Sequence, residues 1–312
     1  MAVYAAIDVG TNTLRLLIAE AVGPDDFTIL HEEQEITRLG EGLIRTRLLQ
    51  DQPRRRSLAV LRRFAESARG FNAEEVATVA TSAVREAGNR EELIAEFARE
   101  TGLALRVIDG AEEARLTLLG VRHGLRLGSE RVLVMDVGGG STEFVMAKGE
   151  AVEAIVSTGL GVVKLTERYL LSDPPTPDEL QALQQEVSRR IDRLRRELPG
   201  LEETELIGTA GTATTLAAIH LGLTTYDRTR VDGHRLSITR VSELLGKLAP
   251  LSIAARRKIS PLEPGRADVI VAGAAIVVTA MERLGYRELI VSDGGLREGI
   301  MLDLLRKAGP SG

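Results

Sequence analysis

Two stretches of this sequence repeat one another. Residues 3–20 are VYAAIDVGTNTLRLLIAE, and residues 132–149 are VLVMDVGGGSTEFVMAKG. Aligning Asp8 with Asp136 also matches the Val-Gly pair that follows each aspartate. Each copy consists of an apolar strand, an aspartate, a small polar turn and a second apolar strand, which is typical of a β-hairpin. The chain is therefore predicted to fold as a duplicated structure.

The turns of the two hairpins are suited to binding anions. Glycine and small hydroxyl residues turn tightly and leave backbone N–H groups uncovered by side chains. The aspartate that ends each leading strand adds a hard oxygen ligand, which suits Mg²⁺ bridging to phosphate. Two such turns facing each other could hold a polyphosphate chain or a nucleotide. The candidate phosphate-binding residues are Asp8, Gly10, Thr11, Asn12 and Thr13 in the first copy, and Gly138, Gly139, Gly140 and Ser141 in the second.

Composition limits the classes of function. The chain has 312 residues, which is long enough for two domains with separate cores. Its net charge is −5 and only 3% of its residues are aromatic, so we expect no DNA partner. Cysteine is absent, which excludes thiolate catalysis, sulfur-bound zinc and disulfides.

No segment predicts export or membrane insertion. The N-terminus enters a strand directly, without a basic start or a cleavage site. The longest apolar run, Val269 to Met281, is too short to span a bilayer and predicts a buried helix. Its first part, Val269–Val278, is also a candidate for a hinge region or a dimer contact. We expect a cytoplasmic protein without membrane association, and a homodimer.

The order of predicted elements supports two α/β domains. Three strands followed by alternating helices and strands occur twice, which predicts two related domains with mixed sheets and a ligand-binding cleft between them. The boundary is expected near 128–130, giving domains 1–128 and 129–312. The predicted strands are 28–37, 76–81, 103–108, 131–137, 142–147, 151–157, 205–208 and 288–291, besides the first hairpin. The predicted helices are 57–69, 89–100, 111–125, 162–171, 177–198, 212–221, 267–284 and 296–307, with an insertion near 224–264.

Other patterns are less specific. The arginines at 189, 190, 193, 195 and 196 lie off the apolar stripe of one helix and predict a solvated face, with a positive rim for a long anion as the alternative. The four histidines show no ligand spacing and no catalytic triad, and His234 has no assigned role. The sequence contains no P-loop motif.

Several separated motifs, taken together, closely resemble the exopolyphosphatase/guanosine pentaphosphatase (Ppx/GppA) family. The resemblance runs from about Tyr4 to about Leu305. Besides the two hairpins, it rests on 110–115 (GAEEAR), 158–161 (TGLG), 208–212 (GTAGT), 265–268 (GRAD) and 292–299 (SDGGLREG).

The resemblance implies a fold. The family belongs to the actin/sugar-kinase/acetate-kinase superfamily, so two ribonuclease-H-like domains with an interdomain active-site cleft are expected. The C-terminal helix 296–308 is a candidate to pack back on the first domain. Larger members carry a further helical domain marked by a His-Asp doublet. No histidine here precedes an aspartate, so the chain resembles the short, two-domain form.

The resemblance also implies site residues. Glu113 matches the family's catalytic glutamate, and Arg85 matches an arginine that holds phosphate oxygens. Asp136 and Glu143 match residues that hold Mg²⁺ or another divalent cation. Arg15 occupies the position of Glu143 in the first hairpin, which suggests direct phosphate contact there. Gly211 lies in a turn that resembles a nucleotide-side turn of the superfamily.

The residues alone leave these roles open. An acidic residue in a first helical turn is often present only because the helix dipole favours it, which is the alternative for Glu113. Glu112 is the competitor for the role of base. The two side chains diverge by about 100° on a helix, so only one can face the site.

The implied activity is the hydrolysis of the terminal phosphoanhydride of inorganic polyphosphate, releasing orthophosphate. Guanosine pentaphosphate, an alarmone of the stringent response, is the alternative substrate. A sensor that binds polyphosphate or guanosine penta- or tetraphosphate with weak hydrolysis is a second alternative, and a phosphotransferase is a third. Chain-length preference, metal preference and oligomeric state stay open.

Overall fold

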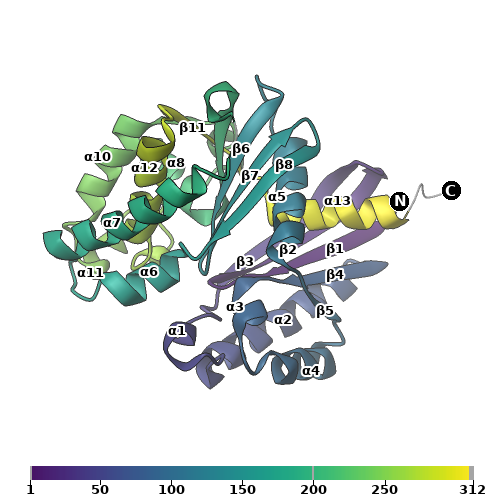
Figure 1. Ribbon diagram of the computed structural model, residues 1–312. Helices are drawn as coiled ribbons and strands as arrows, with labels where there is room; N and C mark the ends of the chain where they lie inside the picture. The colour runs from purple at the N-terminus through teal and green to yellow at the C-terminus, as the bar shows by residue number, and fades with distance from the viewer. Residues whose placement is uncertain (1, 199, 309–312) are drawn as a thin grey trace. The chain divides into compact units, whose positions relative to one another are not determined.

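The computed structural model describes residues 2–198 and 200–308 (Figure 1). The chain folds into two compact units. The first runs through His123 and resumes at Gly294, and the second is Gly124–Asp293. We propose these limits as domain boundaries. They lie a few residues before the sequence-based break at 128, and residues 309–312 of the predicted second domain lie outside the described part.

The first unit contains a five-stranded sheet with the strand order β3-β2-β1-β4-β5. β1 and β2 are antiparallel, whereas β1 and β4 are parallel. The elements are β1 (Val3–Val9), β2 (Thr13–Gly23), β3 (Asp26–Ile36), α1 (Leu43–Thr46), α2 (Asp51–Gly70), β4 (Glu75–Ala80), α3 (Ser82–Glu86), α4 (Arg90–Thr101), β5 (Leu105–Val107), α5 (Gly110–Gly124) and α13 (Leu296–Ala308).

Both faces of this sheet are covered. Side chains alternate along β1, so that Ala5 and Ile7 join a core with α2 and α4 while Tyr4 and Ala6 join a second core. The second core is completed by α13, the yellow helix in Figure 1, through residues such as Ile300. The C-terminal helix is thus part of the first unit.

The second unit repeats this arrangement with the strand order β8-β7-β6-β9-β11-β10. β6 pairs antiparallel with β7 and parallel with β9, as β1 does with β2 and β4. The predicted α/β class with two sheets of related order is therefore confirmed. The elements are β6 (Arg131–Val137), β7 (Thr142–Lys148), β8 (Ala151–Thr158), α6 (Val162–Tyr169), α7 (Pro177–Leu194), η1 (Leu201–Glu203), β9 (Glu205–Thr209), α8 (Ala210–His220), α9 (Arg228–Val231), β10 (Arg235–Ser237), α10 (Ile238–Leu248), α11 (Ile253–Arg256), η2 (Pro264–Arg266), α12 (Ile270–Leu284) and β11 (Glu288–Val291).

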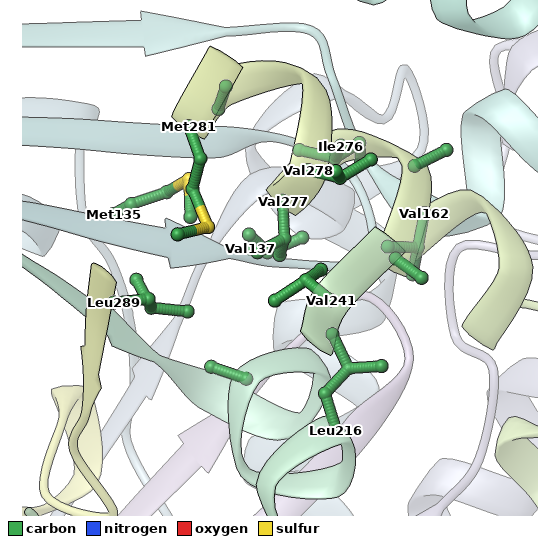
Figure 2. Packing of buried hydrophobic residues seen from close by; sticks show 14 of the residues in the cluster. Met135, Val137, Val162, Leu216, Val241, Ile276, Val277, Val278, Met281 and Leu289 are labelled. Atoms are coloured by element: carbon green, nitrogen blue, oxygen red, sulfur yellow. The ribbon is translucent and has the colours of Figure 1, made fainter. Parts of the chain in front are cut away.

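The core of the second unit is built around α12. Figure 2 shows Val277 and Met281 of α12 beside Val137 and Met135 of β6. The prediction of a buried helix in this apolar run is confirmed, since residues 270–281 are all buried. A dimer contact would need another surface. Within the described ranges, no helix has the length and apolar character needed to cross a bilayer.

One helix boundary was predicted wrongly, and one insertion contains elements that were not predicted. α2 begins at Asp51 rather than Ser57, because Pro53 lies in the first turn, where proline is tolerated. The insertion near 224–264, for which no elements were predicted, contains β10 and α10 along with shorter helices.

Candidate functional site

The first hairpin places Asp8 and Arg15 side by side. They are directly opposite each other in the antiparallel pair of β1 and β2, so their side chains emerge on the same face of the sheet. The turn is closed by the Gly10 N–H, which donates to the carbonyl oxygen of Thr13 at 3.2 Å. Asp8 is buried, so its carboxylate is held in a fixed place at the end of β1.

The turn of the first hairpin is held from one side by residues 38–40. The N–H of Gly40 donates to the Thr11 carbonyl oxygen at 2.8 Å, and the N–H of Arg38 donates to that of Asn12 at 3.0 Å. In a trans peptide the N–H points away from the C=O. The N–H groups of Asn12 and Thr13 therefore face away from residues 38–40, as an anion-binding turn requires.

Glu113 and Arg85 are brought together in the first unit. Arg85 lies on α3, directly after β4, and its Nη1 donates to Glu113 Oε2 at 2.9 Å and to the Ile108 carbonyl oxygen at 2.8 Å. Glu113 lies in the first turn of α5 and is only 7% exposed. The structure thus places a buried carboxylate in contact with a cation.

The neighbouring Glu112 faces elsewhere. At the start of α5, its backbone N–H donates to Asp109 Oδ1 at 2.8 Å. Its carboxylate forms an ion pair with Arg106. The two acidic side chains diverge as helical geometry requires. Of the two, only Glu113 contacts Arg85 in the contacts described here.

The second hairpin has the same backbone with different side chains. Asp136 lies directly opposite Glu143, and the N–H of Gly138 donates to the Ser141 carbonyl oxygen at 2.9 Å. Glu143 is 2% exposed, and its Oε1 accepts a hydrogen bond from Ser157 Oγ at 2.8 Å. The first hairpin thus pairs an acidic with a basic residue at this position, whereas the second pairs two acidic residues.

The turn of the second hairpin is held by the start of α6. The first two N–H groups of α6 donate to the carbonyl oxygens of Gly138 and Gly139, at 3.0 and 2.9 Å. By the same peptide geometry, the N–H groups of Gly139 and Gly140 face away from α6. Gly161 allows this approach, since a Cβ there would lie 2.4 Å from the Gly139 oxygen. The two turns thus have similar geometry and different supports.

The turn between β9 and α8 holds Gly211 against an arginine. A Cβ on Gly211 would lie 1.3 Å from Arg266 Nη1, so a larger residue there would have to displace that guanidinium. The preceding Ala210 has a φ of 65°, a strained value for a residue with a Cβ. Arg266 Nε donates to Glu263 Oε2 at 2.6 Å. This contact was not predicted from the sequence, although Arg266 belongs to the GRAD motif.

Arg256 supports the segment that carries Arg266. It is 2% exposed, its Nε donates to the Leu251 carbonyl oxygen at 3.0 Å, and its Nη1 donates to that of Ala267 at 2.5 Å. Replacing Arg256 with Met, which has a similar side-chain volume, would leave the part-buried Leu251 carbonyl and the buried Ala267 carbonyl without this donor. We expect the free energy of unfolding to fall by about 2–4 kcal/mol, measured by urea denaturation. An unchanged urea midpoint would contradict this role.

His234 has a defined environment. Its ring lies 5.4 Å from that of His220, centroid to centroid. Burial, and then the neighbouring His220, lower the pKa of His234 from its ordinary value, which favours the uncharged ring.

The donor set limits the kind of metal that could bind. Across residues 2–198 and 200–308, no group of three or more His, Cys, Asp or Glu side chains is arranged to hold a metal ion. Asp136 and Glu143 are two adjacent hard-oxygen donors. Mg²⁺ accepts one or two carboxylates together with water and phosphate oxygens, so this sparse pair fits it.

Two α/β sheets of related order, each with an aspartate-bearing hairpin on equivalent strands, define a duplicated α/β protein. The chain matches the model of the Ppx/GppA phosphatase family over residues 17–308. It is 38% identical to exopolyphosphatase 2 of Mycobacterium tuberculosis, over 96% of this chain and 98% of that protein. The crystal structure of the Aquifex aeolicus Ppx/GppA family member is 33% identical, with a TM-score of 0.84 over 99% of each chain. An exopolyphosphatase structure from Cytophaga hutchinsonii is 27% identical, with a TM-score of 0.90 over 98% of each chain. The chain therefore belongs to the Ppx/GppA phosphatase family.

Proposed function

We propose that the protein is an exopolyphosphatase that releases orthophosphate from the end of inorganic polyphosphate. The observation that carries the proposal is the buried Glu113 in contact with Arg85, in the unit whose hairpin turn directs its amides away from residues 38–40. The 38% identity to exopolyphosphatase 2 over nearly the whole chain supports the same activity.

In this proposal Glu113 acts as the general base. Its carboxylate takes a proton from a water molecule as the water oxygen attacks the terminal phosphorus, and the bond from that phosphorus to the bridging oxygen breaks. The bridging oxygen stays with the shortened chain. Arg85 holds Glu113 in place through Nη1 and has further guanidinium N–H groups for phosphate oxygens.

The hairpin turns would bind phosphate oxygens through backbone N–H groups. In the first unit these are the amides of Asn12 and Thr13, with Arg15 beside Asp8 as a direct phosphate contact. In the second unit the amides of Gly139 and Gly140 would have the same role, and the Ser141 hydroxyl would be a further donor. Fixed donors of this kind stabilise charge that develops on the phosphoryl oxygens.

Asp136 and Glu143 are the proposed ligands of a divalent cation. When bound, Mg²⁺ would neutralise phosphate charge. We expect that chelation with EDTA lowers orthophosphate release by roughly 10²-fold or more and that excess Mg²⁺ restores it. Asp136→Asn is expected to raise the Mg²⁺ concentration needed for half-maximal activity. Full release in EDTA would contradict a metal requirement.

The test of the function is orthophosphate release by the purified protein with Mg²⁺, comparing polyphosphate with guanosine pentaphosphate. Higher kcat/KM on polyphosphate supports the proposal, and preference for the nucleotide would replace it with a guanosine pentaphosphate hydrolase. Binding of either without release would favour a sensor. A cytoplasmic location and a homodimer remain sequence-based predictions.

A further inference from the structure

Residues 38–49, here called the α1 segment, join the first hairpin to the region of Arg85. At one end, the segment is bonded to the hairpin turn through Arg38 and Gly40. At the other end, the Arg47 carbonyl oxygen accepts the N–H of Gly88, two residues beyond α3, at 2.9 Å. The segment therefore lies against both candidate phosphate-binding parts of the first unit.

The far end of the α1 segment is firmly held. The N–H of Leu49 donates to Asn89 Oδ1 at 2.9 Å, and Asn89 Nδ2 donates to the Leu49 carbonyl oxygen at 3.1 Å. Inside the segment, Thr46 Oγ1 donates to the Gly42 carbonyl oxygen at 3.0 Å, and Gln50 Nε2 donates to Thr46 Oγ1 at 2.7 Å. Its side chains are therefore displayed from a fixed backbone.

Two arginines project from this support into solvent. Arg45 and Arg47 are exposed, and neither forms an ion pair with a carboxylate in the part of the chain that the structure describes. Arg56 and Arg63 of the neighbouring α2 differ, since Arg56 pairs with Glu41 and Arg63 pairs with Glu33. Unneutralised arginines in a chain of net charge −5 make this a local positive surface.

The backbone at Arg47 adds a second observation. Its φ is 60°, in the left-handed region where glycine is favoured, and a side chain there costs about 1–2 kcal/mol. A glycine would relieve this strain without losing the bond from Gly88. Strain kept at an exposed arginine is more readily explained by a use for its side chain than by packing.

We propose that Arg45 and Arg47 form a subsite for the internal phosphates of a linear polyphosphate whose end lies at the first hairpin. This inference rests on the proposed function. An internal phosphate has charged oxygens but no terminal group to cleave, so mobile, bidentate guanidinium donors suit it. Tripolyphosphate has a single internal phosphate, whereas a long chain has many, so loss of the subsite should weaken binding of the long chain more.

The test compares binding of long-chain polyphosphate and tripolyphosphate in a Glu113→Gln background, so that hydrolysis does not consume the ligand. The variant is Arg45→Gln/Arg47→Gln, and the control is Arg126→Gln/Arg257→Gln, which removes the same charge from exposed positions of the second unit. We expect the variant to raise the Kd for long chains roughly 10-fold. The slope of log Kd against the logarithm of the salt concentration should fall by about 1–2.

Tripolyphosphate affinity should change less than about twofold in the variant, and long-chain affinity should change less than about twofold in the control. The subsite would be contradicted if the variant weakened binding of both ligands equally or of neither. It would also be contradicted if the control lost as much long-chain affinity as the variant. A Glu113→Gln protein that binds long chains no more tightly than tripolyphosphate would contradict the subsite as well. Because binding is measured without turnover, failure of the wild-type protein to release orthophosphate would overturn the proposed function and leave this result to stand by itself.

Discussion

Replacing Glu113 with Gln is expected to lower kcat for orthophosphate release from polyphosphate by about 10²–10⁴-fold, because the amide cannot accept the proton of the attacking water. Glutamine has nearly the same shape, and its Oε1 can still accept the hydrogen bond that Arg85 Nη1 donates to Glu113. The variant should therefore fold, and the loss should appear mainly in kcat. The measurement is steady-state orthophosphate release with saturating polyphosphate and Mg²⁺.

Glu112→Gln is the matched control. It makes the same chemical change one residue earlier on α5, at a partly exposed side chain that pairs with Arg106. Exposed ion pairs contribute little, so kcat should stay within about twofold of the wild-type value. If the two variants lost activity equally, charge near the start of α5 would be responsible rather than a base at Glu113. A fully active Glu113→Gln protein would remove Glu113 from the mechanism.

The fold was predictable because its main signals are local. The continuous apolar runs of β1 and β6, and the repeated Asp-Val-Gly turn, predict two hairpins from short stretches of sequence. The elements that were missed depend on distant partners. β10 has only three residues and exists because it pairs with β11, which lies about 50 positions later. No local pattern marks such a strand.

The residues of the candidate site remain predictions from the sequence, and the structure adds the contacts that support them. The resemblance identified Glu113, and the structure adds that its partner is Arg85 and that Glu112 faces Arg106. The bonds that orient the two turns come from residues 38–40 and from the start of α6. These are backbone hydrogen bonds between remote segments, so they leave no signature in residue type beyond the glycines that permit close approach.

The second large effect is expected from Gly299→Ala in α13. A Cβ on Gly299 would lie 1.8 Å from the Leu116 carbonyl oxygen of α5, and a Cβ on Gly120 would lie 1.9 Å from that of Gly295. The backbones of α5 and α13 therefore touch, and an added methyl group must push the helices apart. This would open the core between α13 and β1, where Ile300 packs. We expect the free energy of unfolding to fall by roughly 3–5 kcal/mol, measured by urea denaturation.

Gly246→Ala is the control for the intrinsic effect of the substitution. Gly246 lies in α10, and a Cβ there would meet no atom within 4 Å. Alanine favours a helix over glycine by about 0.5–1 kcal/mol, so this variant should be slightly more stable than the wild-type protein. The same propensity gain applies to Gly299→Ala, so any net loss there measures the steric cost of separating α5 from α13. A stabilised Gly299→Ala protein would show that the two helices can move apart freely.

Because α5 also carries Glu113, a destabilised Gly299→Ala protein that stays folded in buffer should lose orthophosphate release as well.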